Sequence, residues 1–159
     1  MTMLAFELAF EYRNPVIVAG DGYLGQITGK VTLPDQMIHP GLPEWAVYGD
    51  HDHRGNLVAS IQITEQDLER KNIHLNEKYY KMQRHEQRAD QYYCDDAEIV
   101  IIAANTPAQM AKAAVQQLRE LDIPVGLYRP QTLWPFPIDP LMKLMPNIRD
   151  IIVVTRTTA

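Results

Sequence analysis

The sequence has 159 residues, of which 46% are hydrophobic and 22% are charged, and its formal net charge is −5. That is enough apolar material for one ordinary soluble domain or for pieces of two. A negative net charge gives no bulk attraction to nucleic acid or to an anionic membrane, so neither is expected as a partner. No apolar run approaches the roughly 18 residues of a membrane span, and the N-terminal stretch lacks the basic region of a signal peptide, so we expect a cytoplasmic location.

The first third of the chain alternates short apolar runs with turns. Residues 3–12 have the apolar pattern of a largely buried helix, and residues 16–19 (VIVA) predict a buried strand. Gly20-Asp21-Gly22 then turns the chain, and residues 23–30 are expected to form a short helix. Residues 35–55 are rich in Pro, Gly and His, which predicts a long connection, followed by an extended segment over residues 56–63.

A long polar helix is predicted next. Thr64 is a suitable N-cap, with Asp67 where a capping box prefers Glu. The helix is expected to cover residues 67–92, and the pattern also allows a break within residues 72–76. Its polarity indicates an element that braces a surface and not a core helix.

The last block reads as a parallel βαβ unit. The run Ile99–Ile102 predicts a strand that is buried on both faces, and Val125–Tyr128 predicts the second strand. Between them lies an amphipathic helix, for which Thr106 is a fair N-cap with Pro107 at the first helical position. A short helix over residues 140–145 and a third strand over residues 151–154 complete the block.

The single cysteine, Cys94, excludes a disulfide within the chain and any cluster or zinc site built on several thiolates. It is expected at a helix end. No activating base can be assigned to it from the sequence, so we expect an inert thiol.

Two motifs have a chemical interpretation and a structural one. Residues 20–25 (GDGYLG) fit G-x-G-x-x-G after a predicted strand, which is typical of a dinucleotide-binding turn. The crossover helix and second strand of a Rossmann unit do not follow, which argues against dinucleotide binding. A stand-alone nucleotide-binding or scaffold module is kept as the alternative function. The motif is equally compatible with a structural turn in which the glycines adopt positive φ.

His51-Asp52-His53-Arg54 offers metal ligands but no third ligand at a fixed spacing, which favours a solvated loop.

The segment RPQTLWPFP (residues 129–137) follows the second strand of the βαβ unit. Arg129 could hold a carboxylate or phosphate, although an ion pair that anchors the turn is the favoured interpretation. Trp134 and Phe136 alternate with prolines and form a rigid apolar wedge that suits packing against a partner.

In combination, the motifs DGYLGQ, WAVYGD, DDAEIVI and RPQTLWPFP resemble the alpha subunit of 2-oxoacid:ferredoxin oxidoreductases, most closely the branched-chain (2-oxoisovalerate) type. The resemblance implies an α/β fold: the end of a thiamine-diphosphate pyrimidine-binding domain (residues 1–33), a linker with an extended segment (34–66), and a transketolase C-terminal-like domain (67–159). The latter would be a three-layer domain with a mainly parallel sheet. Asn105 departs from the glycine that the family usually carries, but asparagine also tolerates a left-handed backbone.

The resemblance further implies a function within a complex. A 2-oxoacid would be oxidatively decarboxylated to an acyl-CoA, with electrons passed to ferredoxin. Thiamine diphosphate, magnesium and iron–sulfur clusters would be held by the assembled complex, whose beta, gamma and ferredoxin-like subunits are the expected partners, and none by this chain alone. Members of the family continue beyond the stretch seen here at both ends, so we expect a fragment that is inactive in isolation. No catalytic, cofactor-binding or metal-binding residue is assigned, and an active-site or subunit-interface surface is predicted at Asp21, Gly22, Tyr23, Gln26, Arg129, Trp134 and Phe136.

Overall fold

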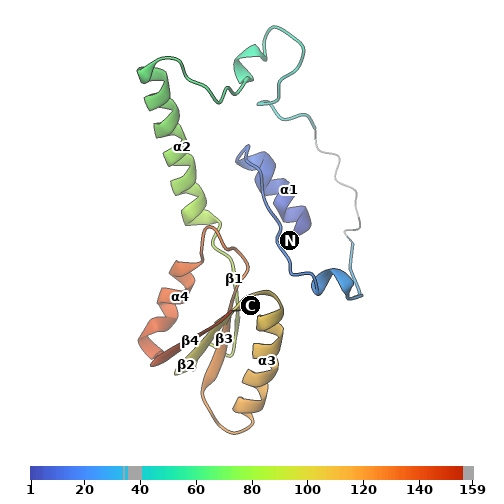
Figure 1. Cartoon of the computed structure of the whole chain (residues 1–159), viewed down its shortest axis with the longest axis vertical. Helices are drawn as coiled ribbons and strands as arrows, with labels where there is room; N and C mark the ends of the chain where they lie inside the picture. The colour runs from blue at the N-terminus through green and yellow to red at the C-terminus, as the bar shows by residue number, and fades with distance from the viewer. Residues whose placement is uncertain (34, 36–40, 156–159) are drawn as a thin grey trace. The chain divides into compact units, whose positions relative to one another are not determined.

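A computed structural model describes residues 1–33, 35 and 41–155 of the chain (Figure 1). The chain divides into two compact units, one made of Met1–Ala19 with Ile27–Asn76 and the other of Gly20–Gln26 with the chain from Glu77 onward. The domain boundaries predicted from the sequence, after residues 33 and 66, stay predictions. The predicted linker falls partly on residues 34 and 36–40, which lie outside the described part.

The first unit is built around an N-terminal helix and a tryptophan. Helix α1 (Thr2–Glu11) matches the predicted helix, but none of its residues is buried. The Trp45 indole N–H donates a hydrogen bond to the Phe10 carbonyl (3.1 Å), and the Arg13 guanidinium lies 5.1 Å from the centre of the indole ring. Trp45 therefore ties the loop of the first unit to the end of α1.

The strand predicted at residues 16–19 is wrong. These residues form no strand, and Ile17 is 89% exposed. A strand is stable only when its backbone pairs with a neighbour and its side chains are covered, and among the described residues this segment has neither. The helix predicted at residues 23–30 shrinks to one 3₁₀ turn, η1 (Leu24–Gln26), and the loop further on contains a second, η2 (Arg54–Asn56).

Helix α2 (Glu65–His85) begins where the sequence predicted it. The Thr64 hydroxyl oxygen accepts a hydrogen bond from the Asp67 N–H (3.2 Å), as expected of an N-cap. The helix runs without the break that the sequence allowed. Its predicted extension to residue 92 is wrong, because Ala89–Tyr92 form strand β1. Pairing with a neighbouring strand overrides the local helical pattern there, and that pairing is not visible in the local sequence.

The second unit contains a four-stranded, mostly parallel sheet of order β1-β3-β2-β4. Strands β2 (Ile99–Ala103), β3 (Val125–Pro130) and β4 (Asp150–Val154) confirm the three predicted strands, and β2 pairs in parallel with both β3 and β4. Strand β1 pairs antiparallel with β3, with Asp90 opposite Arg129. Strand β1 lies within the range predicted as helix and is not predicted by the sequence.

Helices cover both faces of the sheet and give the three-layer α/β arrangement (Figure 1). Helix α3 (Asn105–Arg119) packs through Ala108, Ala111 and Val115 on Ile101, Ala103, Val125 and Leu127. Helix α4 (Ile138–Leu144), continued by η3 (Met145–Asn147), places Leu141 against Ala97, Val100 and Tyr128 on the opposite face. Alternate residues of β2 and β3 thus serve the two cores, as the pleat requires.

No helix in the described ranges combines the length and the apolar composition that a membrane crossing requires.

The connection between β1 and β2 passes close over the start of β3. A Cβ atom built on Gly126 would lie 2.5 Å from the Tyr93 carbonyl oxygen and 3.0 Å from the Cys94 Cα. Arg119, at the end of α3, holds the same connection. Its guanidinium donates to the Tyr93 carbonyl (2.8 Å) and the Asp96 carboxylate (2.7 Å), and its Nε–H donates to the Val125 carbonyl (2.7 Å).

Replacement of Gly126 by alanine is expected to lower the free energy of unfolding by about 1–3 kcal/mol, because the new methyl group collides with backbone that cannot rotate away. Urea titration of the full chain, followed by circular dichroism, measures the loss. Gly41→Ala is the control, since no atom lies within 4 Å of its added Cβ. Equal stability of the two variants would contradict the close approach.

Candidate functional site

The first predicted site segment, Gly20–Gln26, belongs to the second unit and contacts the start of α3. The Asp21 carboxylate accepts hydrogen bonds from the Thr106 backbone N–H (3.0 Å) and the Thr106 hydroxyl, and its other oxygen accepts one from the Leu24 N–H (3.0 Å). A carboxylate at the N-terminus of a helix also interacts favourably with the helix dipole. Asp21 therefore caps a helix 85 positions away in the sequence.

The glycines of this segment do not have the role that the sequence suggested. None of Gly20, Gly22 and Gly25 has a positive φ, so the interpretation of a turn with left-handed glycines is wrong. The turn is closed by the Asp21 side chain and the Leu24 N–H. The carboxylate lies where an anion would bind to α3, and like charge disfavours a phosphate there.

The start of α3 differs slightly from the prediction. The helix includes Asn105 and Thr106, so its N-cap is Ala104 and not Thr106. Asn105 has a φ of 53°, which confirms that asparagine takes up the left-handed conformation at this turn. The cap that Thr106 was expected to supply comes from Asp21 instead.

The second predicted segment starts at the carboxyl end of β3. Arg129 forms an ion pair with Asp90 on the neighbouring strand β1 (3.1 Å), as the favoured interpretation expected. Asp90 also accepts a hydrogen bond from the Gln131 side chain (2.5 Å). The buried Tyr128 hydroxyl donates to the Pro137 carbonyl. These contacts fix both ends of the loop that carries Trp134 and Phe136.

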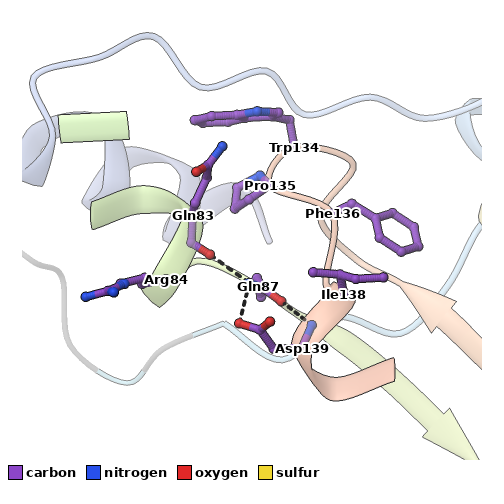
Figure 2. A pocket seen from close by; sticks show the side chains of 8 residues that line it. All are labelled: Gln83, Arg84, Gln87, Trp134, Pro135, Phe136, Ile138 and Asp139. Carbon is purple, nitrogen blue, oxygen red and sulfur yellow. Dashed lines mark hydrogen bonds between the residues drawn. The ribbon is translucent and has the colours of Figure 1, made fainter. Parts of the chain in front are cut away.

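Trp134 and Phe136 border an open groove between this loop and the end of α2 (Figure 2). Trp134 is 55% exposed and packs edge-on against Tyr79 of α2, with 5.8 Å between the ring centres. The groove has a volume of about 410 Å³ and is lined by Gln83, Arg84, Gln87, Trp134, Pro135, Phe136, Ile138 and Asp139. The sequence predicts a surface at the two aromatic residues, which stays a prediction, and gives no sign of the wall that α2 supplies.

Gln87 joins the elements that form the groove. Its side-chain N–H₂ donates to the Gln83 carbonyl (2.7 Å) and to the Asp139 carboxylate (2.9 Å), and its side-chain oxygen accepts from the Asp139 N–H (2.8 Å). One amide therefore connects the end of α2 with the first turn of α4. No local pattern announces it, because the partners are 52 positions apart.

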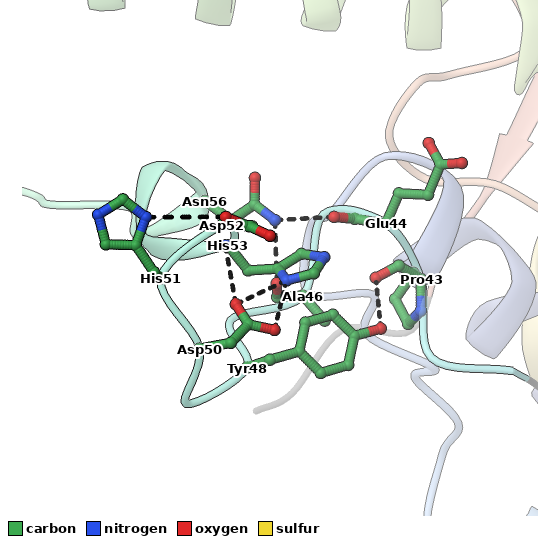
Figure 3. A network of polar contacts seen from close by, with 9 residues as sticks. All are labelled: Pro43, Glu44, Ala46, Tyr48, Asp50, His51, Asp52, His53 and Asn56. Atoms are coloured by element: carbon green, nitrogen blue, oxygen red, sulfur yellow. Dashed lines mark hydrogen bonds and ion pairs between the residues drawn. The ribbon is translucent and has the colours of Figure 1, made fainter.

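The His51–Arg54 segment is an exposed loop in the first unit (Figure 3). The Asp50 carboxylate accepts from the His53 N–H (2.9 Å) and contacts the His53 ring nitrogen Nδ1 (2.8 Å), and these hydrogen bonds lower the pKa of Asp50. The Asn56 side chain donates to the carbonyls of Glu44 and Ala46 (2.7 and 3.0 Å) and holds the loop together. Within the described ranges no three His, Cys, Asp or Glu side chains are arranged to hold a metal.

Cys94 lies in the connection between β1 and β2 and not at a helix end as predicted, and it is buried. Its thiol donates to the Leu127 carbonyl (3.2 Å), and burial raises its pKa. A raised pKa reduces the thiolate fraction at neutral pH, which agrees with an inert thiol.

Known proteins resemble both the second unit and most of the whole chain. Residues 97–159 match the family model "Pyruvate:ferredoxin oxidoreductase core domain II". Over 145 residues the sequence is 43% identical to the ketoisovalerate oxidoreductase subunit VorB of Methanothermobacter thermautotrophicus, covering 91% of this chain and 41% of that protein. The chain is thus similar to part of a ketoisovalerate oxidoreductase subunit and to a pyruvate:ferredoxin oxidoreductase domain.

More distant relatives agree with this relationship. The 2-oxoglutarate synthase subunit KorA of Methanocaldococcus jannaschii is 30% identical over 173 residues, covering 90% of this chain and 45% of that protein. A structure of 2-oxoglutarate:ferredoxin oxidoreductase from Magnetococcus marinus superposes with a TM-score of 0.53 at 16% identity, covering 61% of this chain and 17% of that one. This likeness supports the mostly parallel α/β fold. The chain spans less than half the length of the relatives it matches.

Replacement of Asp21 by alanine is expected to free the start of α3 and to cost about 0.5–2 kcal/mol of stability, the range for loss of a helix cap. Hydrogen–deuterium exchange should accelerate at the Thr106 amide, which loses its acceptor, and not at β3. Asp52→Ala removes a carboxylate that is 93% exposed and serves as the control. Unchanged exchange at Thr106 in Asp21→Ala would contradict the contact.

Because the Tyr128 phenol is buried, we expect the folded protein to lose stability at high pH. Burial raises its pKa from 10.0 to about 12. A group that keeps its proton more tightly in the folded state contributes stability below its unfolded pKa and loses that contribution as the pH rises from about 10 towards 12. In spectrophotometric titration Tyr128 should ionise later than the exposed tyrosines, and Tyr128→Phe should remove this late step. A phenol titration completed by pH 11 would contradict its burial.

Proposed function

We propose that this chain forms part of the alpha subunit of a 2-oxoacid:ferredoxin oxidoreductase of the ketoisovalerate type. The complex would decarboxylate a branched-chain 2-oxoacid oxidatively to an acyl-CoA and pass the electrons to ferredoxin. The observation that carries the proposal is the 43% identity to a ketoisovalerate oxidoreductase subunit over 91% of the chain. Identity to the 2-oxoglutarate synthase subunits is lower, 26–30%, which supports a branched-chain substrate over 2-oxoglutarate.

The donor groups of this chain do not fit the cofactors of such an enzyme. An iron–sulfur cluster requires several thiolates, whereas the one cysteine is buried and bonded to a backbone carbonyl. The described residues also bring together no set of acidic side chains that could hold magnesium. We therefore assign thiamine diphosphate, magnesium and the clusters to the beta, gamma and ferredoxin-like subunits, and derive no chemical step from the residues of this chain.

The part that this chain would supply is a shaped surface. Asp21 fixes the segment that contains Gly22, Tyr23 and Gln26 at the start of α3, where Tyr23 is 62% exposed. Carboxyl ends of parallel strands are where α/β proteins place ligands. Arg129 lies at the carboxyl end of β3, and Trp134 and Phe136 follow that strand. We propose that both segments lie at a subunit or active-site surface of the assembled enzyme.

The test is affinity purification of the tagged chain from its native host, with identification of the proteins that accompany it by mass spectrometry. We expect a thiamine-diphosphate-binding subunit and a ferredoxin-like subunit. A soluble, folded bait that recovers neither would overturn the proposal. Saturable binding of NAD by the chain, abolished by Gly22→Asp, would support the alternative of a stand-alone nucleotide-binding module.

The purified complex is expected to reduce ferredoxin with 2-oxoisovalerate at a kcat/KM at least about tenfold above that with 2-oxoglutarate, a difference of about 1.4 kcal/mol. The physical reason is that a pocket shaped for a branched alkyl group leaves the second carboxylate of 2-oxoglutarate buried and unpaired. Ferredoxin reduction, followed by its absorbance with each acid in turn, measures the ratio. A preference for 2-oxoglutarate would refute the substrate assignment but keep the enzyme class.

A further inference from the structure

We infer that the groove between the end of α2 and the Trp134–Asp139 loop receives a segment of another subunit that presents a carboxylate next to an apolar side chain. This rests on the proposed function, because the partner is taken to be a subunit of the same complex. It goes further in naming the chemistry of the contact. Four observations carry it: an apolar wall, a fixed loop, an unpaired cation at the rim and the openness of the groove.

The loop side of the groove exposes large apolar side chains. Trp134 is 55% exposed, Phe136 39% and Ile138 46%, and Tyr79 of α2 continues the surface at 39%. Tryptophan and tyrosine supply much of the binding energy at protein interfaces, and arginine is the other residue enriched there. A large apolar side chain of the partner would bury this wall.

The loop is held in shape before any partner binds. The Tyr128 hydroxyl fixes the Pro137 carbonyl, and Gln87 holds both the N–H and the carboxylate of Asp139. Figure 2 shows Gln87 beneath the groove with Gln83 directed towards Trp134. A loop that is already ordered loses little conformational entropy on binding, so more of the contact energy appears as affinity.

The charged residues that line the groove are Arg84 and Asp139, in a chain whose net charge is −5. Arg84 is exposed and extends along the outer side of α2 (Figure 2), with no ion pair to any residue in the described part of the chain. The one acidic residue that lines the groove, Asp139, is engaged by Gln87. An unpaired guanidinium beside an apolar wall complements a carboxylate beside an apolar side chain.

The openness of the groove favours a polypeptide over a small molecule. A small-molecule site usually encloses 70–90% of its ligand. Here the groove of about 410 Å³ is open to solvent along Trp134, which favours an occupant that extends beyond it. A protein segment that lies across the groove needs no such enclosure, because contacts outside the groove add to its binding.

The experiment places the photoreactive residue p-benzoylphenylalanine at position 134 of the full chain in its native host. After irradiation and purification, the cross-linked peptide is sequenced. We expect a peptide of another subunit with an Asp or Glu within three residues of the cross-linked apolar side chain. Arg84→Glu should then weaken that subunit's binding at least about tenfold, and reversal of the partner's acid to Lys should restore it.

Lys143→Glu is the matched control, because this exposed lysine of α4 undergoes the same charge change outside the groove and should leave binding unchanged. Far-ultraviolet circular dichroism of each variant excludes misfolding as the cause of lost binding. A cross-link to a second copy of this chain or to its own sequence would overturn the inference, as would a partner peptide without an acid or no cross-link at all. Recovery of the other subunits together with any of these results would leave the proposed function standing, whereas failure to recover those subunits counts against the function itself.

Discussion

The close approach of the Tyr93–Cys94 backbone to Gly126 is the contact on which the arrangement of the second unit depends. It leaves no room for a side chain, so the connection between β1 and β2 rests directly on β3. Arg119 holds this connection from α3 by bonding to the Tyr93 carbonyl, the Asp96 carboxylate and the Val125 carbonyl. This connection therefore joins β1 to β3 and α3. The position of β2 is then set by its parallel pairing with β3.

The same strand sets the geometry of the proposed surface at its other end. Strand β3 is buried over most of its length, and its last residues meet β1 through the Arg129–Asp90 ion pair. The Tyr128 hydroxyl then reaches forward to Pro137 and fixes the far end of the loop. Because two side chains of one buried strand hold the loop, Trp134 can remain half exposed without leaving its position. Rigid support of exposed aromatic side chains is what a preformed binding surface requires.

The sequence predicts the βαβ unit well because its periodic signals are local. The runs at Ile99–Ile102 and Val125–Tyr128 are apolar throughout and flank an amphipathic helix, which is the pattern of two buried parallel strands. The polar run before them was misread because β1 owes its conformation to pairing with β3, about 40 positions away, as in the Asp90–Arg129 pair. The strand predicted at residues 16–19 is wrong because apolar composition alone does not provide a neighbouring strand.

Some residues of the candidate site are also signalled by the local sequence, whereas others are not. Trp134, Phe136 and Arg129 are visible in the sequence because prolines and a strand end mark their positions. Gln87 and the link from Asp21 to Thr106 are not visible, because a single long-range hydrogen bond leaves no periodic or compositional trace. The resemblance to a known family predicts a surface at Asp21, Gly22, Tyr23 and Gln26, which stays a prediction. In the structure, the Asp21 side chain makes the contact that joins this segment to the start of α3.

Burial differs between the two units. The second unit has two hydrophobic cores, one on each face of its sheet. In the described part of the first unit Tyr12 is the buried hydrophobic residue, whereas Ile17 is 89% and Ile63 96% exposed. Burying each of these isoleucines would contribute about 1.5–3 kcal/mol. The second unit can therefore draw its stability from contacts within itself, while the apolar side chains of the first unit would gain theirs from a surface that covers them.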